Sequence, residues 1–167
     1  MIARPRQHTE GFTLAEALLA AAVLSMTVAA ILIPFTVAAV NQHADARITT
    51  ATLLAEEIME EILAKPFHDP NGPSLPGPEA GELSRSQFDN IDDYHGYAEA
   101  EGNIVSSGGV VCDEPAAVGL SRSVSGAYVY VSGQDASGEP NFIRVTVDVR
   151  YHGQPVVSLT RLVHSLD

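Results

Sequence analysis

Glu16 stands apart from the other ionisable side chains because it directly precedes an apolar run, Ala17–Val40, that contains no charged residue. A charge at the centre of a membrane costs about 2.5–3.5 kcal/mol on insertion scales, and acidic side chains kept in such surroundings commonly mark function. Pairing with a positive charge lowers that cost. Glu16 is therefore the first candidate functional residue.

The other residue types that support catalysis form no recognisable site. The serines lack the Gly-x-Ser-x-Gly turn of hydrolases, and Gly108-Gly109 is not followed by the Lys-Ser/Thr of a phosphate-binding loop. The six histidines lack the spacing of a zinc site and are scattered over positions 8, 43, 68, 95, 152 and 164. We therefore predict no catalytic residue, no cofactor and no enzymatic activity.

A second group of carboxylates lies in the stretch FDNIDDYHGYAEAEG, which contains Asp89, Asp92 and Asp93. Oxygen ligands at such short spacing could hold a calcium ion, but the stretch lacks the complete pattern of an EF-hand loop. The alternative is an ordinary polar loop whose aspartates cap its own turns. The sequence favours this loop, with solvent-facing carboxylates and no metal, and leaves the three aspartates as calcium candidates.

The overall charge limits the classes of partner. The chain has 167 residues and a formal net charge of −12, and this argues against a nucleic-acid-binding protein, which would present a basic surface. Its single cysteine, Cys112, cannot form a disulfide within the chain. The length leaves room for one modest domain beyond the apolar run, and that domain must be held together by its core.

The segment 12–40 is long enough to cross a membrane as a helix, which takes roughly 20 apolar residues. Its many alanines allow helices to approach closely. A cleaved secretory signal ending near Val37-Ala38-Ala39 is the alternative, but the run exceeds the roughly 7–15 residues of a signal core and Glu16 interrupts its start. Arg4 and Arg6 predict a cytoplasmic N-terminus.

The segment 41–65 continues the helix with amphipathic character. Its apolar positions recur in alternating steps of four and three, which is typical of one helix face, and they are Ala44, Ile48, Ala51, Ala55, Ile58 and Ile62. The glutamates of the segment occupy the other side, where we expect a solvated face: Glu56, Glu57, Glu60 and Glu61. Lys65-Pro66 ends the helix, because proline disfavours helix in the residue before it.

The rest of the chain, 66–167, is predicted to form a soluble domain. Proline, glycine and acidic residues make 66–125 a loop region, whereas 126–167 alternates apolar and polar residues, as an antiparallel sheet does. The residues around His152-Gly153 read as a turn between two strands. Since the apolar stripe of the helix could cover the apolar face of the sheet, the expected fold class is α+β, a long helix packed on a small antiparallel sheet.

The sequence GFTLAE at Gly11–Glu16, followed by an apolar helix, resembles the processing site of type IV pilins and of the pseudopilins of type II secretion. The later stretch LLAEEIMEEIL is similar to the post-membrane segment of minor pilins and of I-type minor pseudopilins. The resemblance implies a leader, 1–11, that a prepilin peptidase removes by cutting between Gly11 and Phe12. It further implies N-methylation of Phe12 and a role for Glu16 in subunit assembly.

The resemblance also implies a structural role in the bacterial inner membrane and then in a pilus or pseudopilus. The expected partners are the prepilin peptidase and other pilin or pseudopilin subunits, with the soluble domain in the periplasm and 12–40 in the filament core. A different class of function stays open: a membrane-tethered periplasmic binding module that is not part of a filament. A calcium site in residues 89–95 would favour this alternative.

Overall fold

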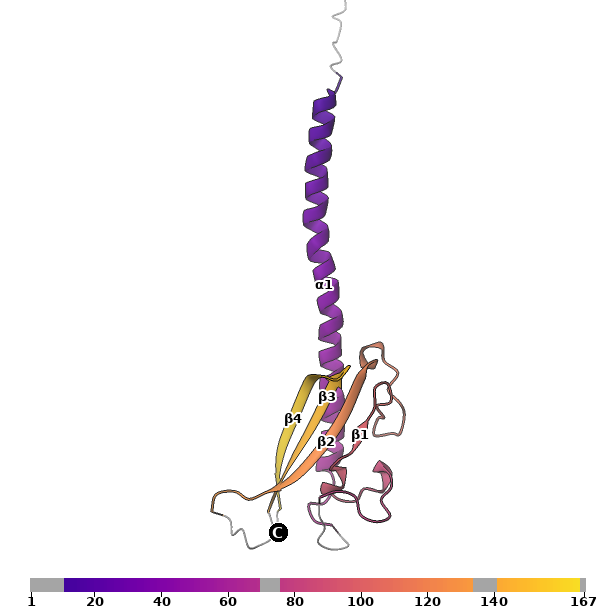
Figure 1. The fold of residues 1–167 in the computed structure, drawn as a ribbon, viewed down its shortest axis with the longest axis vertical. Helices are drawn as coiled ribbons and strands as arrows, with labels where there is room; N and C mark the ends of the chain where they lie inside the picture. The colour runs from indigo at the N-terminus through magenta and orange to yellow at the C-terminus, as the bar shows by residue number, and fades with distance from the viewer. Residues whose placement is uncertain (1–10, 70–75, 134–140, 166–167) are drawn as a thin grey trace, which may run out of the picture. The chain divides into compact units, whose positions relative to one another are not determined.

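The computed structural model describes residues 11–69, 76–133 and 141–165, and within them it has a long helix and four strands (Figure 1). The helix is α1 (Leu14–Leu63), and the strands are β1 (Ala98–Glu99), β2 (Leu120–Val129), β3 (Phe142–Tyr151) and β4 (Gln154–His164). The connections contain three short 3-10 helices, η1 (Arg85–Gln87), η2 (Asp92–Tyr94) and η3 (Pro115–Ala117). This architecture confirms the predicted α+β fold.

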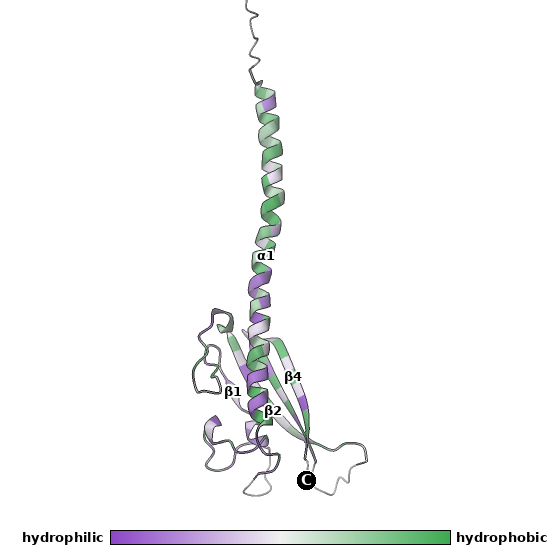
Figure 2. Cartoon of the chain, turned by 180° about the vertical axis from the view of Figure 1, so that it is seen from behind, coloured by the Kyte–Doolittle hydropathy of each residue, from purple (hydrophilic) through white to green (hydrophobic). Residues whose placement is uncertain are grey.

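Contacts divide the chain into two units, Met1–His43 and Ala44–Asp167, and the division falls inside α1. In the first unit, the large apolar side chains of α1 are exposed, including Leu18, Leu24 and Phe35. Figure 2 shows this part of α1 as predominantly hydrophobic. By length and composition, α1 is able to cross a membrane.

In the second unit, the C-terminal part of α1 packs on the sheet. The helix buries Thr50, Ala51, Leu54, Ala55, Ile58, Met59 and Ile62. The sheet contributes alternate residues of β3, of which Ile143, Val145, Val147 and Val149 are fully buried. The predicted alternation of this strand and its cover by the helix stripe are therefore confirmed.

The apolar stripe begins later than the sequence predicts. Ala44 and Ile48 are exposed, and Ile48 keeps 50% of its surface accessible. The reason is the extent of the sheet: the guanidinium carbon of Arg47 lies 3.6 Å from the ring centroid of Tyr151, which is the last residue of β3. Helical periodicity therefore identifies the correct face but does not show where the sheet stops covering it.

The sheet is an antiparallel meander in the order β1-β2-β3-β4. The hairpin between β3 and β4 turns through His152 and Gly153, whose φ angles of 45° and 76° are both positive. This is the backbone that a tight two-residue hairpin needs, and it agrees with the predicted turn. The sheet starts before residue 126, because β1 lies at Ala98–Glu99 and β2 begins at Leu120. Hydropathy hides the start of β2, since the inward-facing residue Arg122 is charged but only 1% exposed.

Candidate functional site

The start of α1 is fixed by a reciprocal cap between Thr13 and Glu16. Glu16 Oε2 accepts hydrogen bonds from the Thr13 backbone nitrogen at 2.9 Å and from Thr13 Oγ1 at 2.8 Å, while the Glu16 nitrogen donates to Thr13 Oγ1 at 3.3 Å. This is a capping box, a pattern that satisfies backbone donors at a helix start. The Thr-x-x-Glu spacing of a capping box is present in the sequence. Only the charge of Glu16 beside the apolar run was considered in the sequence, and the cap was not predicted.

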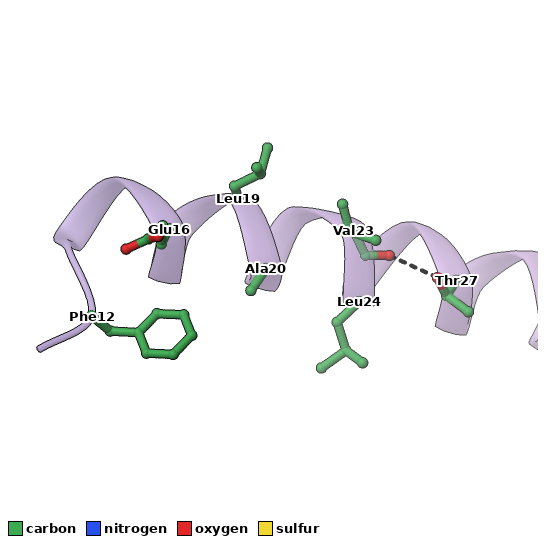
Figure 3. Close-up of a pocket in the computed structure, with 7 residues that line it drawn as sticks. All are labelled: Phe12, Glu16, Leu19, Ala20, Val23, Leu24 and Thr27. Atoms are coloured by element: carbon green, nitrogen blue, oxygen red, sulfur yellow. Dashed lines mark hydrogen bonds between the residues drawn. The ribbon is translucent and has the colours of Figure 1, made fainter. Parts of the chain in front are cut away.

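Phe12 and Glu16 lie at one end of an open pocket along the helix, which Figure 3 shows in close-up. Its other lining residues are Leu19, Ala20, Val23, Leu24 and Thr27. Thr27 Oγ1 donates to the carbonyl oxygen of Val23 at 2.8 Å, so its hydroxyl is satisfied within the helix. The pocket therefore presents an apolar surface with one carboxylate at its end, and the two hydrogen bonds that Glu16 accepts both reach Oε2.

Gly11 is not required by the packing of the described residues. A Cβ atom built on Gly11 would meet no atom within 4 Å. The structure thus places Gly11, Phe12 and Glu16 in sequence order at the helix start, and packing within the described residues sets no limit on the side chain at position 11.

A second candidate site is formed by the acidic residues of the loop region. Asp92 and Asp93 have no exposed surface, so the expectation that they face solvent is wrong. Their carboxylates belong to two clusters that share Asp93: Glu79, Asp92 and Asp93 form one, and Glu82, Asp89 and Asp93 form the other. Within each cluster, one oxygen per residue lies within 4.8 Å of the others.

Local hydrogen bonds hold these aspartates in place. The Asn90 side chain fixes the first residues of η2, since its Oδ1 accepts from the nitrogens of Asp92 at 2.9 Å and Asp93 at 3.1 Å. Asp93 Oδ2 accepts in turn from the nitrogens of Asp89 at 2.8 Å and Asn90 at 3.0 Å. The Tyr128 hydroxyl donates to Asp92 Oδ2 at 2.6 Å and joins the loop to β2.

Burial and mutual repulsion make these carboxylates hard to ionise together. Burial, together with the neighbouring Asp93 and Glu79, raises the pKa of Glu82 to about 7. Burial is also the main cause that raises the pKa of Asp92 and of Asp93.

Glu79 and Glu82 were not predicted as site residues, because both lie in the region predicted to be an irregular loop. A count of the acidic residues in that region would have indicated them.

The raised pKa values predict that metal-free protein loses stability between about pH 4.5 and pH 7. A carboxyl group with a raised folded-state pKa contributes stability below its unfolded-state pKa, and that contribution is lost as the pH rises through the folded-state value. In excess chelator, thermal unfolding followed by circular dichroism should give a lower Tm at pH 8 than at pH 5.

The Glu82→Gln variant should show a smaller pH effect, because glutamine mimics the protonated acid. The exposed residue Asp113 supplies the control, and Asp113→Asn should keep the wild-type pH dependence. A Tm that is constant or rises from pH 5 to pH 8 in the wild type would contradict this account of the cluster.

The glutamates of α1 are not all solvated, contrary to the prediction. Glu61 Oε1 accepts from Arg85 Nε at 2.8 Å and from the Tyr94 hydroxyl at 2.7 Å. Arg85 also reaches Glu99 at 3.4 Å, and Glu99 pairs with Arg122 at 2.6 Å. This network joins α1, η1 and the sheet, and it explains why Arg122 is tolerated inside the domain.

Comparison with models of known protein families finds no match, and neither curated proteins nor solved structures match the chain.

Proposed function

We propose that this chain is a structural subunit, a minor pilin or minor pseudopilin, of a type IV pilus or a type II secretion pseudopilus. The observation that carries the proposal is the sequence GFTLAE at Gly11–Glu16, placed directly at the start of a long helix with an exposed apolar first part. A peptidase removes 1–11, and the mature chain assembles through α1. The peptidase and the other subunits are the partners.

The surroundings of Gly11 support processing at this position. Packing within the described residues does not require a glycine there, because a Cβ atom would find open space. A residue without Cβ does, however, let another backbone or a catalytic group approach closely. A peptidase that acts on the bond between Gly11 and Phe12 would supply that requirement.

The apolar part of α1 supports insertion in the inner membrane and later packing in a filament. In this proposal, Arg4 and Arg6 keep the leader in the cytoplasm, and the Ala44–Asp167 unit lies in the periplasm. The small side chains of α1, such as Ala20, Ala21 and Ala22, permit close contact between neighbouring helices. Glu16 supplies the polar contact that fixes the position of these helices along one another.

N-terminal sequencing of the membrane-extracted mature protein tests the proposal. We expect the chain to start at Phe12, with a methyl group on its amine. The Gly11→Val chain is the matched control and should keep residues 1–11, because the added side chain blocks close approach of the peptidase. A mature start near residue 40 would instead identify a secretory signal and would contradict the proposal.

A further inference from the structure

Two oxygens in the acidic cluster of the loop region lack the partners that buried oxygens normally have. Asp92 Oδ1 and Asp93 Oδ1 are inaccessible to solvent and accept no hydrogen bond from any described residue. Both side chains belong to residues with no exposed surface. A buried acceptor left without a partner is costly, and a specific case in a folded protein calls for an explanation such as an ion.

We propose that these oxygens are ligands of one calcium ion, bound by the carboxylate cluster centred on Asp93. Its oxygens lie within 4.8 Å of one another in each of the two groups that share Asp93. Ligands on opposite sides of a calcium ion are about 4.6–5.2 Å apart, twice the calcium–oxygen distance of 2.3–2.6 Å. The spacing within each group therefore suits one ion, and Asp93, which both groups share, is the ligand common to them.

The charges around the cluster favour a cation. Among the described residues, no basic side chain forms an ion pair with Glu82, Asp92 or Asp93. The nearest arginine in sequence, Arg85, is directed to Glu61, to Glu99 and to the carbonyl oxygen of Val105. Several carboxylates thus share a partly buried space without a balancing positive charge from these residues, and a divalent cation would supply it.

The donor set selects the kind of metal. The cluster offers carboxylate oxygens only, which suit hard cations such as Ca²⁺ and Mg²⁺, whereas zinc favours histidine and cysteine. His95 is in neither carboxylate group, and its Nδ1 accepts from the Gly126 nitrogen at 3.2 Å. Magnesium requires a strict octahedron at about 2.0–2.1 Å and keeps much of its water. Several carboxylates on loops favour calcium.

The ion would connect three parts of the Ala44–Asp167 unit. Asp93 is anchored by the Asp89 and Asn90 nitrogens, and Asp92 is anchored to β2 through Tyr128. Binding would therefore lock the residues around Glu79 and Glu82 against η2 and the sheet. This site is independent of processing at Gly11, so the inference does not rest on the proposed function.

Thermal unfolding and calorimetry of the full chain in detergent test the site. After treatment with chelator, CaCl₂ is added at pH 7.5, and binding is measured by titration calorimetry. We expect one calcium ion per chain and a Tm that rises by roughly 5–10 °C at 100 times the dissociation constant, because the ion binds only the folded state. MgCl₂ at equal concentration should raise the Tm less.

Three variants locate the ion. Asp93→Asn and Glu82→Gln keep the side-chain shape and remove a charge, and each should weaken calcium binding at least about tenfold. Asp113→Asn, at an exposed position outside both carboxylate groups, should bind as the wild type does. If Asp93→Asn does not fold, the calcium affinity of Glu82→Gln tests the site. Glu82 is only partly buried, so we expect this variant to fold.

Three results would overturn the inference. A wild-type Tm that does not respond to calcium would show that protons, and not a metal, neutralise the cluster. Unchanged calcium affinity in both Glu82→Gln and Asp93→Asn would place any bound ion elsewhere. An equal or larger effect of magnesium would contradict the assignment to calcium.

Discussion

Replacing Ile58 with aspartate is expected to unfold the Ala44–Asp167 unit or to leave it marginally stable. Ile58 has no exposed surface and belongs to the face of α1 that packs on the sheet. An unpaired carboxylate at such a position costs several kcal/mol, which is a large part of the roughly 5–15 kcal/mol that stabilises a typical domain. Urea unfolding of the full chain in detergent, followed by circular dichroism, measures the loss.

Ile48 provides the matched control within the same helix. It lies on the face that periodicity assigns to the core, yet 50% of its surface is exposed. The Ile48→Asp substitution makes the same chemical change and is expected to shift the free energy of unfolding by about 0.5 kcal/mol or less. Equal losses in the two variants would show that the change in residue type, and not packing on the sheet, causes the destabilisation.

Ile48 also shows how far the sequence can predict this fold. Periodicity depends on neighbours along the helix, so it correctly assigned Ile58 and Ile62 to the buried face. Whether a given turn is covered depends on where another element ends. Here the covering strand ends at Tyr151, which lies far away in the chain and packs near Arg47. Helical periodicity carries no information about the position of that strand end.

The buried charges illustrate the same limit for the candidate sites. Arg122 is tolerated inside because Glu99 and the carbonyl oxygen of Leu54 accept its hydrogen bonds at 2.6 Å each. A sequence read by hydropathy places such a residue outside. Asp92 and Asp93 were misplaced for the same reason, since their burial depends on the loop folding back onto β2. The motif at Gly11–Glu16 could be recognised from the sequence alone, because its residues are consecutive.

Replacing Glu16 with valine is expected to leave processing and membrane insertion intact but to prevent assembly of the subunit. In the proposed function, cleavage exposes the positive amine of Phe12, four residues before Glu16. An isolated charge in an apolar layer is costly, and an opposite charge on a neighbouring subunit lowers that cost. Contact between this amine and Glu16 of a neighbour would therefore fix the axial register of the helices. Co-purification with partner subunits measures assembly.

The capping box supplies a competing explanation, and two variants separate it from charge pairing. Thr13→Val removes the hydroxyl that contacts Glu16 and costs the helix start about 1 kcal/mol, but it keeps the charge, so we expect it to assemble. Glu16→Gln keeps a hydrogen-bond acceptor for the Thr13 nitrogen and loses the charge, so its assembly should be intermediate at best. Normal assembly of Glu16→Val would exclude the pairing. Failure of Thr13→Val together with full assembly of Glu16→Gln would assign Glu16 to the cap, because the charge would then be dispensable and the helix start would not.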